Sequence, residues 1–225
     1  MSEHFLDNVV WHSLASAHAP FATGTASAKR FARGFPPMAG FEDAERPDFA
    51  ALAPYCEPGD RLYCAGWSGP LPPGWRIEVD SSMHQFVWEG PTPPDAGDVA
   101  RLDARHAEQM VALVALTKPG PFGLRSTELG EYYGLFEGER LIAMAGERLA
   151  AGPYREVSAV CTHPDFQGRG LARRLMDKVI RLQMARGQTP FLHVMDANSR
   201  ARELYRRMGF RRRRELALRV VARAE

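Results

Sequence analysis

One strand–turn–helix segment in the second half of the chain constrains the fold more than any other part of the sequence. An apolar stretch, Val157–Thr162, leads into a turn that contains Gly168 and Gly170. The residues after the turn carry leucine or valine at spacings of four, four and three, which is typical of a helix with one face on a core. The pattern predicts a strand, a glycine-rich turn and a helix over Gly168–Arg186 that ends at Gly187.

The glycine-rich turn predicts an anion site. Glycine lets the backbone approach a ligand closely, and the first amides of a helix have no partner within it. With the helix dipole they suit a pyrophosphate, and Arg169 and Arg173 add positive charge. A Gly-x-Gly pair alone is more often only the start of a helix. Arg173 stands where a Rossmann fingerprint needs a third small residue, and the chain has no Gly-Lys-Ser/Thr of a Walker loop.

The rest of the second half alternates predicted strands and helices. The expected strands are Val99–Leu102, Tyr133–Phe136, Arg140–Arg148, Glu156–Thr162, Phe191–Met195 and Glu215–Val221. The other expected helices are Ala104–Leu116, a short one from Ser126, and Ser199–Met208. This order predicts an α/β (α+β) fold with a mixed central sheet flanked by helices.

The first half has a different composition. Residues 1–100 hold 12 of the 17 prolines and all four tryptophans, and their net charge is −7, against +9 for residues 101–225. Because residues 89–98 are rich in proline, glycine and acid, they are expected to link two units, 1–97 and 98–225. The first unit is expected to be a smaller α+β domain of unclear role. Its predicted helices are Ala26–Phe31 and Phe49–Tyr55, and its predicted strands are Arg61–Ala65, Trp75–Asp80 and His84–Trp88.

Several classes of protein are excluded by composition. The chain is 45% hydrophobic and 25% charged, as in ordinary globular proteins, and its longest apolar runs are too short to cross a bilayer. Met1–His4 lacks the basic start and long apolar stretch of a signal peptide. Cys56, Cys64 and Cys161 form no C-x-x-C pattern, so we expect reduced thiols, no metal and a cytoplasmic location.

Two motifs give the second half a resemblance to a known family. Residues 167–172 read Gln-Gly-Arg-Gly-Leu-Ala, which matches the Gln/Arg-x-x-Gly-x-Gly/Ala signature of the GNAT superfamily of N-acetyltransferases. Residues 198–210 resemble its second motif, Asn-x-x-Ala-x-x-Leu-Tyr-x-x-x-Gly-Phe. The resemblance covers about residues 99–225, and the most similar subgroup is the FR47-like acetyltransferases. It implies the GNAT acyl-CoA N-acyltransferase fold, and the first unit could be a degenerate relative of it.

The resemblance implies a site for acetyl-CoA as co-substrate. The strand before the turn would part from its neighbour and bind the pantetheine arm, and a backbone N–H near Val160 or Cys161 would hold the oxyanion. Asn198 would contact the arm or fix the helix after it. The implied coenzyme-binding residues are Val160, Cys161, Thr162, Gln167, Gly168, Arg169, Gly170, Leu171, Ala172, Asn198 and Tyr205.

Two residues are implied to move protons. Tyr205 matches the family's general acid, which would protonate the leaving thiolate; by position alone it would be a core aromatic. Glu156 lies eleven residues before Gln167, like the general base of the histone-acetylating members. Burial would raise its pKa toward neutrality. The alternative is a structural glutamate paired with Arg155 or another arginine.

The implied function is an acyl-CoA-dependent N-acetyltransferase. It would move an acetyl group to a primary amine of a small molecule, amino acid or peptide by direct transfer in a ternary complex. The alternative is a non-catalytic CoA-binding or interaction module. Cys161 is expected to be a buried apolar residue rather than a nucleophile, and Arg211–Arg214 a solvated loop. We expect no nucleic-acid or membrane partner; a homodimer is left open.

Overall fold

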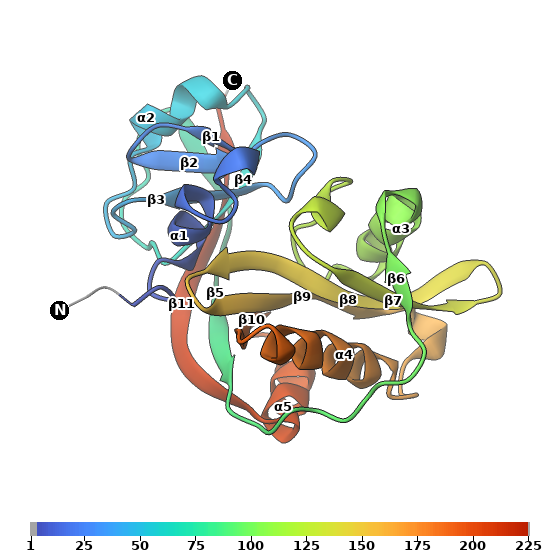
Figure 1. Cartoon of the computed structure of the whole chain (residues 1–225). Coiled ribbons are helices and arrows are strands. Elements are labelled where there is room, and N and C mark those ends of the chain that lie inside the picture. The colour runs from blue at the N-terminus through green and yellow to red at the C-terminus, as the bar shows by residue number, and fades with distance from the viewer. Residues whose placement is uncertain (1–3, 225) are drawn as a thin grey trace.

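The computed structural model describes residues 4–224 and contains one mixed sheet of eleven strands (Figure 1). The strand order is β1-β2-β3-β4-β11-β5-β10-β9-β8-β7-β6. Met1–Glu3, part of the segment used above to argue against a signal peptide, and Glu225 lie outside the described residues. The strands are β1 Ala22–Gly24, β2 Ala28–Phe31, β3 Met38–Phe41, β4 Arg61–Ala65, β5 Trp75–Trp88, β6 Ala100–Leu102, β7 Tyr132–Glu137, β8 Arg140–Ala151, β9 Tyr154–Thr162, β10 Thr189–Met195 and β11 Phe210–Arg223.

Within residues 4–224, five α-helices pack around the sheet: α1 Val9–Ala15, α2 Phe49–Leu52, α3 Ala107–Thr117, α4 Leu171–Ala185 and α5 Ser199–Met208. Short 3-10 helices span Ala19–Phe21, Ala53–Tyr55, Ala104–His106, Ser126–Glu128 and Pro164–Phe166. Helix α4 packs on β7 to β10, whereas α3 packs on β8 and β9 from the opposite face (Figure 1). The mixed α/β architecture expected from the sequence is confirmed.

The main core lies beneath α4 and α5. On α4, the buried stripe consists of Leu175, Met176, Val179 and Ile180, each at most 1% exposed. Phe86, Trp88, Leu192 and Phe210 meet this stripe from the sheet. Full burial of one such aliphatic side chain contributes about 1.5–3 kcal/mol, so this face fixes α4, and with it the glycine turn, against the sheet.

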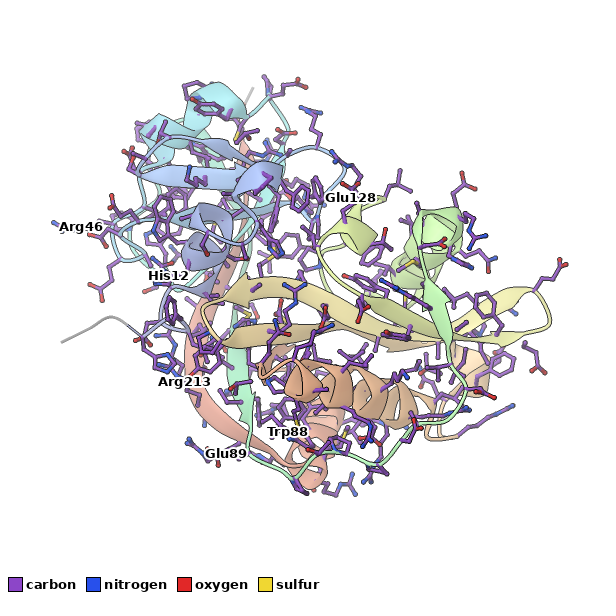
Figure 2. The ribbon with its side chains drawn as sticks, viewed as in Figure 1. His12, Arg46, Trp88, Glu89, Glu128 and Arg213 are labelled. Atoms are coloured by element: carbon purple, nitrogen blue, oxygen red, sulfur yellow. The ribbon has the colours of Figure 1, made fainter. Side chains whose placement is uncertain are left out.

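The second half follows the predicted element order, with one correction. The run Arg211–Arg214 is not a loop, because it forms the start of β11 and pairs with β5. Arg213 and Arg214 bind the segment before α1 through Asp7, and Figure 2 shows Arg213 beside β11. Each of the four arginines also has an acidic partner, which is Glu89 for Arg211, Glu215 for Arg212 and Asp7 for the other two.

The first half differs more from expectation. The predicted helix Ala26–Phe31 is wrong: Ala28–Phe31 is strand β2, which pairs with β1 and β3. Tertiary pairing overrides the helix preference of its alanine, lysine and arginine. The predicted strands Trp75–Asp80 and His84–Trp88 are parts of one 14-residue strand, β5, because the residues between them continue to pair with β11.

Strand β5 joins the two halves of the chain. It is antiparallel to both β10 and β11 and lies between them, so residues from the first half supply an interior strand of the sheet formed by the second. The segment 89–98 that follows lies along α4, where Arg181 donates to the Pro93 carbonyl at 3.0 Å and Arg174 to the Ala96 carbonyl at 2.8 Å. The division into units 1–97 and 98–225 stays a prediction.

Candidate active site

The site is built around a separation of two parallel strands. Strand β9 pairs with β10 only over Tyr154–Glu156 and then leaves it. On its other edge β9 pairs with β8, and there two residues of β9, Ala159 and Val160, lie opposite one residue of β8, Ala145. This arrangement is a β-bulge. Ala159 has a φ of 51°, in the left-handed region that costs a residue with a Cβ of order 1–3 kcal/mol. The bulge turns the backbone at Ala159 and Val160 out of the β8 ladder.

The glycine turn follows directly. Gly168 and Gly170 have φ values of 79° and 76°, and no atom lies within 4 Å of where their Cβ atoms would be. Gln167 braces the turn by donating from Nε2 to the Thr162 carbonyl at 3.4 Å. Helix α4 then begins at Leu171, so its first amides open onto space. The side chain of Arg169 stacks over Phe166 at 4.8 Å.

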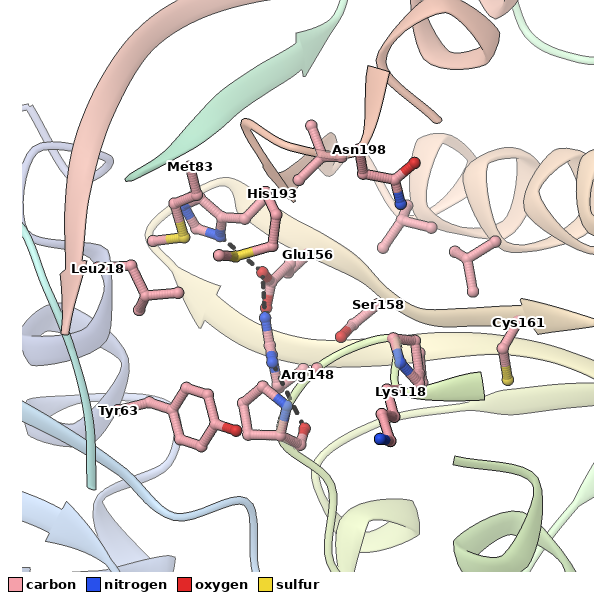
Figure 3. Close-up of a pocket in the computed structure, with 18 of the residues that line it drawn as sticks. Tyr63, Met83, Lys118, Arg148, Glu156, Ser158, Cys161, His193, Asn198 and Leu218 are labelled. Atoms are coloured by element: carbon pink, nitrogen blue, oxygen red, sulfur yellow. Dashed lines mark hydrogen bonds and ion pairs between the residues drawn. The ribbon is translucent and has the colours of Figure 1, made fainter. Parts of the chain in front are cut away.

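A cavity of about 690 Å³ starts at the bulge and reaches the first half of the chain (Figure 3). Among the predicted coenzyme residues, it is lined by Val160, Cys161, Thr162, Gln167, Asn198 and Tyr205. The predicted residues Gly168–Ala172 are not among the residues that line the cavity and lie at the start of α4. The far wall is apolar and comes mainly from the first half and β11: Val10, Met38, Tyr63, Ala65, Val79, Met83, Leu218 and Val220.

Tyr205 faces this cavity from α5 and is 8% exposed. Burial raises the pKa of its phenol to about 12, so the hydroxyl keeps its proton across the neutral range. Asn198 caps the same helix, because its Oδ1 accepts from the Ala201 amide at 3.1 Å. The second motif therefore orients α5 and places its tyrosine in the wall of the cavity that the bulge also lines.

Two side chains of β9 line the cavity beside Tyr205. Burial raises the pKa of the Cys161 thiol to about 11, which leaves it protonated at neutral pH and fits a buried apolar role. The Thr162 hydroxyl is buried and has no hydrogen-bond partner among residues 4–224. An unpaired buried hydroxyl costs free energy, so this group suits a polar ligand atom in the cavity.

Glu156 is fully buried and tightly bound. Its carboxylate accepts two hydrogen bonds from Arg148, both at 2.8 Å, one from His193 Nδ1 at 2.7 Å, and one from the Leu149 amide at 3.3 Å. Burial opposes the charged form, but Arg148 and His193 together lower the pKa of Glu156 well below its ordinary value. The expected upward shift is wrong. The geometry favours the alternative reading, a glutamate paired with an arginine, although the partner is Arg148 and not Arg155.

The Glu156 network continues across three neighbouring strands. Gln85 on β5 donates from Nε2 to His193 Nε2 and to the Leu6 carbonyl, both at 3.1 Å. Its Oε1 accepts from Arg213 at 3.0 Å. Because an amide nitrogen cannot accept, His193 Nε2 must be the acceptor and Nδ1 the protonated nitrogen. The arrangement fixes the orientation of the His193 ring between Gln85 and Glu156.

Arg148, His193 and Tyr63 line the cavity and were missed by sequence reasoning. One signal was available: Arg148 and Glu156 are charged residues inside otherwise apolar strand patterns, which indicates a buried pair. Tyr63 carries no such signal. Lys118 also lines the cavity.

The described part of the chain was searched for metal-ligand clusters and for membrane-spanning helices. Within residues 4–224 no group of three His, Cys, Asp or Glu side chains is placed to hold a metal ion. Over the same residues, none of the helices is both long and apolar enough to span a bilayer.

Comparison with known proteins agrees with this geometry. Residues 132–220 match the model of the family described as FR47-like protein. The chain is 34% identical over 128 residues to N-alpha-acetyltransferase RimI of Mycobacterium tuberculosis, an alignment that covers 53% of this chain and 80% of that one.

Solved structures extend the likeness to both halves. A protein assigned to the GNAT family of acetyltransferases from Novosphingobium aromaticivorans superposes with a TM-score of 0.87 at 32% identity, over 99% of this chain and 100% of that one. A GCN5-related N-acetyltransferase from Kribbella flavida shares the fold at 14% identity, with a TM-score of 0.58 over 96% and 95% of the two chains. The parted strands, the glycine turn and these relatives together show that the chain belongs to the GNAT family of acetyltransferases and carries an FR47-like segment.

Proposed function

We propose that the protein moves the acetyl group of acetyl-CoA directly to a primary amine of a small molecule, amino acid or peptide, in a ternary complex. The observation that carries the proposal is the convergence of the β9 bulge and Tyr205 on one cavity. The name of the Mycobacterium tuberculosis relative supports an α-amine as the acceptor group.

The residues at the bulge and turn fit acetyl-CoA. Backbone groups at Val160–Thr162, with the unpaired Thr162 hydroxyl, offer partners for the amides of a pantetheine arm. The open turn from Gln167 to Ala172 offers amides and Arg169 to a pyrophosphate. Asn198 holds the helix that carries Tyr205. The thioester supplies the activated acetyl group.

In this arrangement the protein stabilises charge at two atoms. A backbone N–H near Val160 or Cys161 donates to the carbonyl oxygen as it becomes an oxyanion, and one such donor contributes about 10²–10³-fold in rate. The Tyr205 hydroxyl donates its proton to the departing sulfur, a step that contributes typically about 10²–10⁴-fold. The amine's own proton must also leave.

The sequence predicted Glu156 as the general base, but its hydrogen bonds leave little room for it to accept a proton from the amine. A carboxylate offers about four lone-pair positions, and Arg148, His193 and Leu149 occupy four. The amine would therefore reach the site neutral or pass its proton to water, with Glu156 acting by holding Arg148.

Replacing Tyr205 by Phe tests the proposal against the alternative, a non-catalytic CoA-binding module. Thiol release from acetyl-CoA in the presence of amines reports turnover, and calorimetry with coenzyme A reports binding. We expect kcat to fall about 10²-fold or more while coenzyme affinity is kept. Coenzyme binding by the wild-type protein without acetyl transfer to any amine would favour the alternative.

The remaining expectations are proposals as well. Three buried free cysteines support a reducing compartment such as the cytoplasm. A homodimer, and the lack of nucleic-acid and membrane partners, stay predictions.

A further inference from the structure

The charged groups in the cavity wall are not balanced. Three lining side chains carry charge at neutral pH: Lys118, Arg148 and Glu156. Cys161 and Tyr205 keep their protons, because burial raises the pKa of both side chains. Arg148 and Glu156 neutralise each other, so the positive charge of Lys118 is in excess.

No carboxylate in the wall is free to bind an ammonium group. Glu156 is the acidic residue among those that line the cavity, and Arg148, His193 and Leu149 fill its lone-pair positions. The cavity therefore does not select an acceptor by the charge of its amine.

The Arg148 guanidinium, in contrast, has donors to spare. Nε and one N–H of Nη2 bind Glu156, and Nη1 makes a long contact of 3.5 Å to the Pro121 carbonyl. A guanidinium has five N–H groups, so two have no partner among the hydrogen bonds of residues 4–224. Glu156 holds the group rigidly by a bidentate contact, and the guanidinium is always charged.

Lys118 lies on the same side of the cavity as Arg148, and Tyr63 points its hydroxyl toward that region (Figure 3). Lys118 caps α3 with a left-handed φ of 48°, is exposed, and makes no ion pair within residues 4–224. Two cationic donors and a phenol thus face one part of the acceptor space.

We propose that the acceptor carries an anionic group, a carboxylate, which Lys118 and the free N–H groups of Arg148 bind. This inference rests on the proposed function, since it concerns the amine substrate. The apolar part of the acceptor packs on the wall from the first half and β11, including Met38, Met83 and Leu218.

The spacing between amine and carboxylate is bounded by strand geometry. Glu156, which holds Arg148, lies four residues before Val160 on β9, roughly 13 Å along a strand at about 3.3 Å per residue. Each residue of an extended acceptor adds at most about 3.3–3.6 Å, so one residue is much shorter than this span and three residues reach about 10–11 Å of it. The probes are therefore acids of increasing length.

The test compares leucine, glycyl-leucine and glycyl-glycyl-leucine, each as the free acid and as the C-terminal amide, by thiol release from acetyl-CoA. Amidation removes the nearby negative charge, lowers the amine pKa and so increases the neutral amine. A larger neutral fraction of the amine favours the amide. A higher kcat/KM for the acid therefore cannot result from the change in amine pKa. We expect kcat/KM for the acid to exceed that for the amide by about tenfold or more in at least one pair, as for one charged hydrogen bond.

The variant Lys118→Met tests the cation itself. It keeps the length of the side chain, whereas removal of Arg148 would leave Glu156 buried and unpaired and could unfold the protein. We expect KM for the preferred acid to rise about tenfold in K118M, with the amide unchanged. Lys29→Met, on β2 outside the cavity, is the matched control and should leave both unchanged.

Two results would overturn the inference. Equal kcat/KM for acid and amide at every length would show that no anionic group is recognised. Acetylation of these probes would nevertheless support the proposed function. Failure of every probe, acid and amide alike, to release thiol would overturn the inference together with the proposed function.

Discussion

Replacing Glu156 by Gln separates the two roles that this residue could have. The substitution keeps the shape of the side chain and an oxygen for His193, but removes the charge that neutralises Arg148. The Arg148 side chain is only 10% exposed, so water cannot replace the lost partner. Loss of one member of a buried ion pair costs about 3–5 kcal/mol.

This cost predicts a large shift in thermal unfolding. For a chain of this size, 1 kcal/mol moves Tm by about 2–4 °C, so about 3 kcal/mol lowers the Tm of E156Q by roughly 6–12 °C. The control Glu203→Gln removes an exposed pair with Arg207 and should change stability by about 1 kcal/mol or less. Calorimetry or urea unfolding at neutral pH measures both.

The pH dependence gives a second readout. Because Arg148 and His193 lower the pKa of folded Glu156 below the unfolded value of about 4.3, its stabilisation is complete above that value. It is lost as the pH falls toward the folded pKa. E156Q should therefore lose less stability than the wild type between about pH 5 and pH 3. An unchanged Tm with kcat reduced about 10²-fold or more would refute the ion-pair reading and establish the base.

Three further predictions concern the sheet and the bulge. The fragment 98–225 should fail to unfold cooperatively by circular dichroism, since it lacks β4 and β5, which leaves β11 without a paired strand and β10 paired only with the first residues of β9; a soluble, cooperative fragment would confirm two independent domains. Ala159→Gly should match or exceed wild-type stability, whereas Ala159→Val should lower it by about 1–3 kcal/mol, because only glycine tolerates a φ of 51° freely; equal Tm values for both variants would contradict this. Cys161→Ala should keep kcat within a few-fold in the thiol-release assay, because a protonated thiol forms no acyl-enzyme; loss of turnover with an unchanged fold would count against direct transfer.

Local signals explain what the sequence could predict. The glycine turn, the stripe on α4 and the helix Ser199–Met208 each depend on neighbouring residues, and their element types were predicted. The same is true of Asn198 as the residue that fixes α5, one of the two roles expected for it.

Long-range pairing explains what the sequence could not predict. Strand β5 enters the sheet beside β10 and β11, more than 100 residues away in the chain, and nothing local marks it as interior. The direction of the Glu156 pKa shift depended on Arg148 from β8 and His193 from β10, which no spacing rule connects. The first half contributes to the cavity wall because its strands join the same sheet as those of the second half, and this pairing is not encoded locally in the sequence.

A crystal structure with acetyl-CoA bound would show where the thioester lies. We expect the thioester carbonyl oxygen within hydrogen-bonding distance, about 2.7–3.2 Å, of a backbone nitrogen at Val160 or Cys161, with the sulfur beside the Tyr205 hydroxyl. We also expect the pyrophosphate on the amides between Gly168 and Ala172. Coenzyme bound elsewhere, or a thioester turned away from the bulge, would contradict this expectation.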